Sequence, residues 1–262
     1  MLRWWRARRR RRVLARGRFD AAAFAAALTH VRPAARLPEA DRERLRDLVT
    51  LFVHEKEFVG AHGFVVTDAM RDVIAVQACL LVLELGFDVY DGWQTVVVYP
   101  DQFRTREVSE DEIGIVTIDD EARAGEAWPE GPVVLSWADV LEGVDAGAAG
   151  EAYNLVVHEF AHKLDIRSGA TDGMPPLHAD MDPAEWRREF SAAFADLGAR
   201  VDDGEETRLD PYAATDPAEF FAVTSEAFFE TPHDLLADYP AVYEQLRRYY
   251  RQDPAALAGG AS

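Results

Sequence analysis

Cysteine is almost absent from this chain of 262 residues. The single cysteine, Cys79, excludes an internal disulfide, and this fits a reducing compartment such as the cytoplasm. The apolar run at 73–83 is too short to span a membrane and contains Gln77. Residues 1–18 also lack the apolar segment of a secretory signal. Together these absences predict a cytoplasmic location.

Basic residues are scarce beyond the first 18 positions. The chain has 28 basic against 47 acidic residues, a formal net charge of −19. Nine arginines and no acidic residue lie in residues 1–18, so the rest of the chain is strongly acidic. An acidic surface repels phosphates, and we therefore expect no direct nucleic-acid binding by the body of the protein. The hydrophobic share of 48% predicts a folded core within residues 19–262.

The Arg-rich segment at 1–18 is predicted to be a disordered arm, because a run of like charges repels itself. Such an arm can solvate itself or lie on the acidic body. It can also contact anionic lipid with Trp4 and Trp5 at the interface, or bind nucleic acid. The sequence leaves these interpretations open.

The most informative motif is the run His158-Glu159-Phe160-Ala161-His162, which has the form H-E-x-x-H. On a helix, His158 and His162 lie on one face, one turn apart. Two imidazoles placed in this way can bind one Zn²⁺. Glu159 can then reach a water at the open coordination position and take its proton. The motif predicts a zinc hydrolase, and a peptidase in particular.

A zinc site of this kind needs a third protein ligand. The extended motif with a third histidine requires Gly at 165 and His at 168, where this chain has Asp165 and Ser168. A glutamate from a later helix is the alternative, and Glu219 and Glu226 lie two turns apart on one predicted helix. Glu219 can equally form a capping box with Asp216. Spacing alone does not decide between the two glutamates.

Tyr212 lies seven positions before Glu219 and is a candidate for the same site. A phenol near a zinc ion can donate a hydrogen bond to the oxyanion of a tetrahedral intermediate. A tyrosine that packs beside a turn is the simpler interpretation. The residues by themselves leave both interpretations open.

Periodicity predicts a mostly helical α+β protein. Helices are predicted at 38–58, 68–85, 151–166, 183–201, 217–229 and 240–251. Short β-branched runs predict strands at 94–99, 114–118 and 132–136, the last of them a candidate edge strand for substrate. We expect a small mixed sheet before the motif helix. The zinc cleft would lie in one domain, between an upstream half at about 19–146 and a downstream half at about 147–262.

An ordered set of segments resembles the Mlc titration factor A (MtfA) family, which are bacterial zinc-dependent peptidases of the gluzincin type. The resemblance rests on the H-E-x-x-H run and on the segments at 82–86, 91–93, 98–100, 131–137, 210–226 and 249–254. It covers roughly residues 38–255 and does not include the Arg-rich arm. It implies a zincin-like metallopeptidase fold.

The resemblance also implies a role for each candidate side chain. One Zn²⁺ per chain would be bound by His158, His162 and Glu219. Glu159 would be the catalytic glutamate, and Tyr212 the catalytic tyrosine. This implied assignment favours Glu219 over the other glutamate as the third ligand.

Glu226 and Asp165 then become candidates for orienting a ligand histidine. The resemblance implies aminopeptidase activity on peptide substrates. It also implies an alternative, because the family is named for sequestering the transcriptional repressor Mlc. In that case the chain is a regulatory binding protein, and its peptidase activity is secondary.

Overall fold

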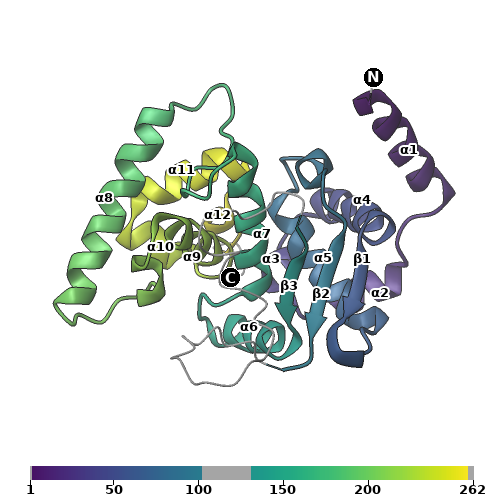
Figure 1. The fold of residues 1–262 in the computed structure, drawn as a ribbon, viewed down its shortest axis with the longest axis horizontal. Coiled ribbons are helices and arrows are strands. Elements are labelled where there is room, and N and C mark those ends of the chain that lie inside the picture. Colours follow the sequence, from purple (N-terminus) through teal and green to yellow (C-terminus); the bar gives the residue numbers. More distant parts are fainter. Residues whose placement is uncertain (1, 102–130, 259–262) are drawn as a thin grey trace, which may run out of the picture.

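Helices make up most of the chain and flank a small sheet (Figure 1). This computed structural model describes residues 2–101 and 131–258. The upstream helices are α1 (Leu2–Arg16), α2 (Ala21–Leu28), α3 (Arg32–Ala35), α4 (Glu39–Glu55), α5 (Asp68–Leu81) and α6 (Trp137–Ala149). The downstream helices are α7 (Leu155–Asp165), α8 (Pro183–Asp202), α9 (Pro217–Glu230), α10 (Pro232–Asp238), α11 (Pro240–Tyr250) and α12 (Pro254–Ala258). The predicted α+β class is confirmed. None of the helices in the described ranges has the length and apolarity that crossing a bilayer requires.

The sheet consists of parallel strands in the order β1-β2-β3, which are Glu57–Gly60, Thr95–Tyr99 and Val133–Ser136. The central strand pairs with both neighbours, so that Val96 lies opposite Phe58 and Val133. Val96 and Val98 are buried and alternate with half-buried residues, because successive side chains of a strand point to opposite faces. We expected a mixed sheet, whereas the pairs among the described strands are all parallel. The strand predicted at 114–118 lies outside the described residues.

Strand β1 is an element that the sequence pattern did not reveal. The helix predicted over 38–58 ends at Glu55, and the backbone becomes extended at Lys56. The Lys56 side chain is buried, and its Nζ donates hydrogen bonds to the carbonyls of Tyr90 and Trp93, each at 2.6 Å. The ammonium also lies 3.6 Å from the centroid of the Trp93 ring. These partners are distant in sequence, so helical periodicity gives no sign of them.

Helix α7 lies between the sheet and the downstream helices (Figure 1). It begins at Leu155, later than predicted, because the Asn154 side chain accepts a hydrogen bond from the backbone N–H of Val157 at 3.0 Å. On its buried face, Phe160 packs against three aromatic rings of the upstream half, with centroids 5.3 to 5.7 Å away: Phe52, Tyr90 and Trp93. This aromatic cluster fixes the rotation of the helix about its axis.

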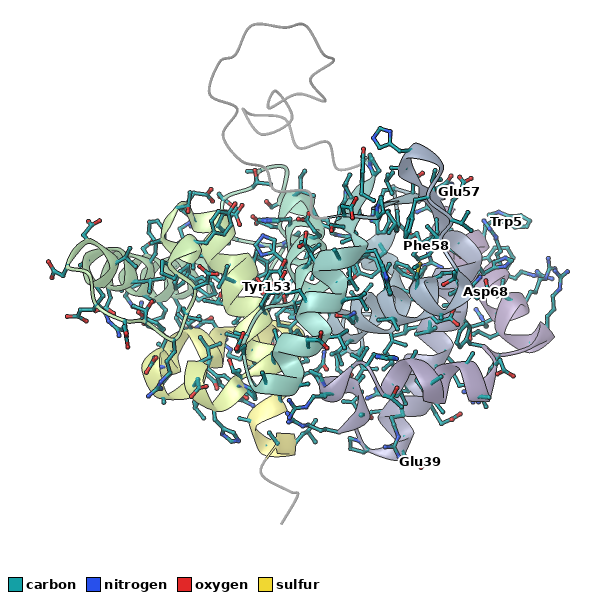
Figure 2. The ribbon with its side chains drawn as sticks, turned by 90° about the horizontal axis from the view of Figure 1, so that it is seen from below. Trp5, Glu39, Glu57, Phe58, Asp68 and Tyr153 are labelled. Atoms are coloured by element: carbon teal, nitrogen blue, oxygen red, sulfur yellow. The ribbon has the colours of Figure 1, made fainter. Side chains whose placement is uncertain are left out.

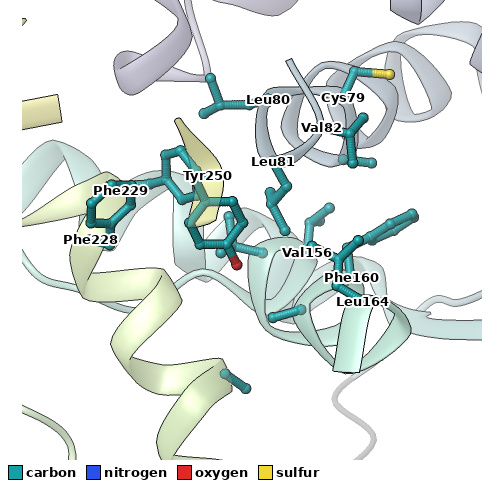
Figure 3. Close-up of a cluster of buried hydrophobic side chains, with 14 of the residues drawn as sticks. Cys79, Leu80, Leu81, Val82, Val156, Phe160, Leu164, Phe228, Phe229 and Tyr250 are labelled. Carbon is teal, nitrogen blue, oxygen red and sulfur yellow. The ribbon is translucent and has the colours of Figure 1, made fainter. Parts of the chain in front are cut away.

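The buried core continues from the upstream half into the downstream half. Figure 3 shows side chains of α5, α7 and α9 gathered around Tyr250 at the end of α11. The Tyr250 hydroxyl donates a hydrogen bond to Ser225 Oγ of α9 at 2.9 Å, which satisfies two polar groups inside this core. One side of α7 is therefore held by Val156, Phe160 and Leu164, all fully buried. The polar residues of the H-E-x-x-H motif are only half-buried and lie outside this apolar side of the helix.

Residues Leu2–Arg16 form helix α1 in place of the predicted disordered arm. The guanidinium of Arg10 is buried and donates hydrogen bonds to Glu55 at 2.9 Å, to Asp91 at 2.6 Å and to Asp88. These carboxylates come from α4 and from the segment before β2. They offset the repulsion within the arginine run, and the prediction of disorder considered only that repulsion.

The segment after α7 contacts both the end of α7 and the start of α9. Asp165, the last residue of α7, is buried and accepts a hydrogen bond from Gly173 N–H at 2.9 Å. The Gly173 carbonyl accepts one from Trp186 Nε1 at 3.0 Å. A Cβ on Gly173 would lie 2.3 Å from the carbonyl oxygen of Pro217, and the backbone φ there is +74°. Both the close approach and the left-handed conformation therefore require glycine.

This contact can be tested by substituting alanine for Gly173. Gly204 offers a matched control, because its φ of +73° is nearly the same but a Cβ added there would meet no atom within 4 Å. We expect Gly173→Ala to lower the free energy of unfolding by about 1–3 kcal/mol more than Gly204→Ala, the typical cost of overpacking. Urea unfolding measures both values. Equal losses in the two variants would show that the approach to Pro217 is not a close packing contact.

Candidate metal centre

Helix α7 presents the two motif histidines on its half-buried face. Their Nε2 atoms are 3.2 Å apart, and their ring centroids are separated by 4.8 Å. This proximity follows from the i, i+4 spacing of His158 and His162, since the opposite side of the helix is fixed in the core. The two nitrogens therefore face the same point.

Glu219 approaches the histidines from the first turn of α9. Asp216 caps this helix by accepting hydrogen bonds from the backbone N–H groups of Ala218 and Glu219 at 2.8 and 3.0 Å. The side chain of Glu219 is directed to α7, where its Oε2 lies 3.0 Å from His158 Nε2 and 3.6 Å from His162 Nε2. Asp216 thus supplies the cap, and the Glu219 carboxylate faces the imidazoles.

The three side chains fit a single divalent cation. One ligand atom from each of them lies within 4.8 Å of the other two. Their separations of 3.0, 3.2 and 3.6 Å scatter around the value of about 3.3 Å between ligand atoms of a tetrahedral site with bonds of about 2.0–2.1 Å. Glu219 Oε2 is buried and accepts no well-formed hydrogen bond from the described residues. Two imidazoles and a carboxylate are a donor set that suits zinc.

The electrostatics of the cluster favour a bound cation. Burial opposes ionisation of Glu219, yet the two histidines outweigh it and hold the pKa of this carboxyl well below its usual range. Burial likewise opposes the charged form of His158, but Glu219 and Glu226 raise the pKa of that imidazole well above its usual value. The carboxylates therefore attract positive charge to the point where the ligand atoms meet.

Glu226 lies on the other side of His158 from Glu219. Its Oε1 is 2.8 Å from His158 Nδ1, and its Oε2 accepts a hydrogen bond from the backbone N–H of Asn154 at 2.5 Å. Burial raises the pKa of Glu226, and the contacts with His158 and Asn154 counteract this rise. A carboxylate can only accept, so this contact places the imidazole proton on Nδ1. Nε2 is then the nitrogen that faces Glu219 and His162, and its lone pair would be free for a metal ion that displaces the second proton.

Glu159 and Tyr212 lie beside this cluster. Glu159 is half-buried on α7. Burial lowers the pKa of the neighbouring Lys163 to about 8, and the charge of Glu159 partly opposes this lowering. Tyr212 belongs to a short 3₁₀ turn, Pro211–Ala214, and its ring centroid is 6.3 Å from that of His158. The tyrosine side chain is 45% exposed, so it borders the site from the solvent side. The structure therefore brings the Tyr212 ring close to His158, and Glu159 follows His158 on the same helix.

Asp165 is fully buried and lies three positions after the second histidine, at the end of α7. Burial raises its pKa to about 6, and the hydrogen bond from Gly173 works against this rise. His162 also lowers this pKa through its charge, so the two side chains lie near each other. Through its hydrogen bond with Gly173, the Asp165 carboxylate holds the segment after α7.

Asn154 and Glu230 are two residues of this region that the sequence reasoning missed. The Asn154 side chain caps α7, its backbone N–H binds Glu226, and its Nδ2 donates to Glu230 Oε1 at 2.7 Å. Burial raises the pKa of Glu230 to about 7, and Asn154 opposes this rise. An asparagine directly before an apolar periodic run is a recognised helix start, and this signal was available. The contact with α9 had no local signal.

Comparison with known proteins adds independent evidence. The model of the family described as glucose-regulated metallo-peptidase M90 matches residues 3–251. An uncharacterised protein of Synechocystis is 38% identical over 221 residues, which is 84% of this chain and 80% of that protein. Mlc titration factor A of Yersinia pestis and of Yersinia pseudotuberculosis is 37% identical over 223 residues, which is 84% of this chain and 81% of those proteins.

The family match begins at residue 3 and therefore includes helix α1. Our expectation that the Arg-rich segment lies outside the family pattern is thus wrong. The resemblance to Mlc titration factor A, in contrast, is confirmed over most of the chain. From the extent of the family match and the identity with these relatives, we conclude that the chain belongs to the glucose-regulated M90 family of metallopeptidases.

Proposed function

We propose that this metallopeptidase is a zinc-dependent aminopeptidase whose ligands are His158, His162 and Glu219. The observation that carries the proposal is the convergence of their three ligand atoms within 4.8 Å, beside a motif glutamate. One Zn²⁺ per chain is consistent with this cluster, since it is the group of potential metal ligands found among the described residues. We also place the protein in the cytoplasm, on the basis of its single, buried cysteine.

When bound, the metal ion would polarise the scissile carbonyl and lower the pKa of a water molecule toward about 7. The Glu159 carboxylate accepts a proton from the attacking water and delivers it to the nitrogen of the leaving amine. Its half-buried position directly after His158, where its charge raises the pKa of that imidazole, supports this role. Glu159 is not part of the ligand cluster and is free to act as a base.

Two further side chains would assist the reaction. Tyr212 would donate its phenolic hydrogen to the oxyanion that forms from the carbonyl, and its ring, 6.3 Å from that of His158 between centroids, supports this role. Glu226 accepts the Nδ1 proton of His158, holds the ring in its orientation and leaves Nε2 as the nitrogen available to a metal ion. Asp165 stabilises the C-terminal end of α7 through Gly173 and so maintains the position of His162.

The preference for a free peptide amino terminus is supported by the charges beside the cluster. Burial raises the pKa of Tyr153, and carboxylates of Asp139, Glu142, Glu159 and Glu226 raise it further. Such a concentration of negative charge attracts the α-ammonium group of a peptide. Figure 2 shows Tyr153 near the middle of the molecule. Strand β3, at one end of the described strand order, is our candidate for binding the substrate backbone.

Sequestration of a transcriptional repressor is a second candidate function. It is favoured by relatives whose name states that they titrate Mlc and that are 37% identical to this chain. The acidic composition, with a net charge of −19, suits the basic surface of a DNA-binding protein. Binding and hydrolysis are compatible, because a partner can regulate the peptidase.

The role of Glu159 is tested by the variant Glu159→Gln. The amide still accepts hydrogen bonds but is a very poor base, so we expect normal zinc content and a rate of peptide hydrolysis lower by about 10²–10⁴-fold. Hydrolysis of an aminoacyl anilide together with elemental analysis measures both. Glu151→Gln, at an exposed position ahead of α7, is the matched control and should keep full activity. Wild-type activity in Glu159→Gln would disprove the assigned mechanism.

The assignment of the third ligand is tested by Glu219→Ala and Glu226→Ala side by side. We expect Glu219→Ala to lose most of its zinc, because it removes a ligand. Glu226→Ala should retain zinc with an affinity about 10–100-fold lower, since it removes the partner that orients His158. Competition with a zinc chelator gives both affinities. Stronger metal loss in Glu226→Ala than in Glu219→Ala would reverse the assignment.

The two functions can be separated by removing the metal. If the chain sequesters a repressor independently of hydrolysis, a repressor captured from the native cell should remain bound after chelation, whereas peptide hydrolysis should stop. The capture is repeated with a variant that lacks residues 1–18, to determine whether the basic segment contributes. Failure of both full-length and shortened protein to retain any repressor would reject this second function.

A further inference from the structure

Helix α1 has two faces of different character. Arg6, Arg10, Val13 and Leu14 are directed at the body of the protein. Arg10 is buried in its ion pairs, Arg6 donates to Asp91 at 2.9 Å, and the two apolar residues pack against the core. The inner face is therefore satisfied by residues of the same chain. What remains is a long outer face on a helix of about 22 Å, at 1.5 Å per residue.

Over residues 4–16, whose side chains the structure describes, the outer face carries arginine, alanine and tryptophan. Trp5 and Arg8 are three positions apart, and Arg12 and Arg16 follow at intervals of four, so these residues line one side of the helix. The arginines of this face are Arg8, Arg9, Arg11, Arg12 and Arg16. All of them are exposed, and none forms an ion pair with an acidic residue in the described parts of the chain. The face is a concentrated positive surface on an otherwise acidic protein.

Two large aromatic side chains lie at the start of this face. Trp4 is 54% exposed and Trp5 is 62% exposed, and their rings meet edge to face with centroids 5.2 Å apart. Arg8 lies over the Trp4 ring, with its guanidinium carbon 5.4 Å from the centroid. Figure 2 shows Trp5 at the end of the molecule, directed away from the core. Exposure of two tryptophans costs free energy in water, and this cost is relieved at a membrane interface.

We propose that α1 docks this protein on an anionic lipid surface, with the arginines against the headgroups and the tryptophan pair in the interfacial layer. A helix with basic and aromatic residues on one face, and without the apolar length to span, lies in the plane of the interface. The carboxylates nearest to it, Glu55, Asp88 and Asp91, are already paired with Arg10 and do not oppose the contact. The proposal is independent of the peptidase assignment.

The chemistry of the face favours lipid over nucleic acid. The rest of the chain is strongly acidic, so a duplex along α1 would bring a second line of phosphates against a body that repels them. A bilayer approaches from one side only and contacts α1 at the end of the molecule, where Figure 1 places it. Repulsion from acidic residues further away is reduced by salt over a Debye length of about 8 Å.

The experiment is co-sedimentation of the full chain with vesicles of phosphatidylcholine alone or with about 30 mol% phosphatidylglycerol, a typical anionic content. We expect binding to the anionic vesicles at least about tenfold stronger than to the neutral ones. Trp4→Ala with Trp5→Ala, and separately Arg8→Gln with Arg12→Gln, should each weaken it by about tenfold or more. Circular dichroism checks that the variants are folded, which their exposed positions favour.

Arg187→Gln with Arg188→Gln on α8 is the matched control, because these two arginines are also exposed but lie at the opposite end of the molecule. It should bind as the wild type does, and so should protein stripped of metal. Fluorescence anisotropy with a short DNA duplex at the same salt concentration is the competing arm. Equal binding to neutral and anionic vesicles, no binding to either, no effect of either α1 variant, or tighter binding to the duplex than to the vesicles would each overturn the proposal.

Discussion

The packing of α7 against α9 is the constraint on which the candidate site depends. The histidines come from one helix and the carboxylate from another, and neither helix alone provides a metal site. The contact is maintained at its ends as well as along its length. Gly173 bridges them by donating to Asp165 of α7 while lying against the Pro217 carbonyl of α9. At the other end, Asn154 before α7 contacts Glu226 of α9.

The Glu226 side chain stabilises both the fold and the candidate site. A carboxylate that is 3% exposed is costly unless each oxygen has a partner. Here one oxygen receives the Nδ1 proton of His158 and the other receives the backbone N–H of Asn154. The same contacts that stabilise the buried charge set the tautomer of the imidazole and fix the first turn of α7. Removal of Glu226 would therefore disturb a ligand and a helix start together.

The local part of this site was predictable from sequence, whereas the tertiary part was not. His158 and His162 are one helical turn apart, so their convergence follows from helix geometry alone. Glu219 and Glu226 also share a face of one helix, and which of them meets Nε2 and which meets Nδ1 depends on how α9 lies against α7. Only the resemblance to known peptidases favoured Glu219, whose Oε2 lies 3.0 Å from His158 Nε2, while Glu226 Oε1 lies 2.8 Å from Nδ1.

In the fold as well, local features were predictable from sequence and contacts between distant segments were not. Helical periodicity located the major helices, because it records which side of each helix is buried. Periodicity did not predict the end of α4 before Lys56, because the Lys56 ammonium donates hydrogen bonds to carbonyls of a distant segment. The prediction of a disordered arm at residues 1–18 had another basis, namely repulsion within an arginine run that has no acidic partner of its own. The partners of Arg10 lie about 45 to 80 positions away, at Glu55, Asp88 and Asp91.

The segment Phe87–Tyr90 connects helix α1 with α7, the helix that carries the motif histidines. Arg10 of α1 pairs with Asp88, while Arg167, directly after α7, donates to the Asp88 carbonyl at 3.2 Å. The Tyr90 ring packs against Phe160 of α7 with centroids 5.3 Å apart. Ion pairs, backbone hydrogen bonds and ring packing thus join α1 and α7 through one short segment. An attachment of this kind leaves little rotational freedom, so a surface that binds α1 would also determine which way the histidine face of α7 is directed.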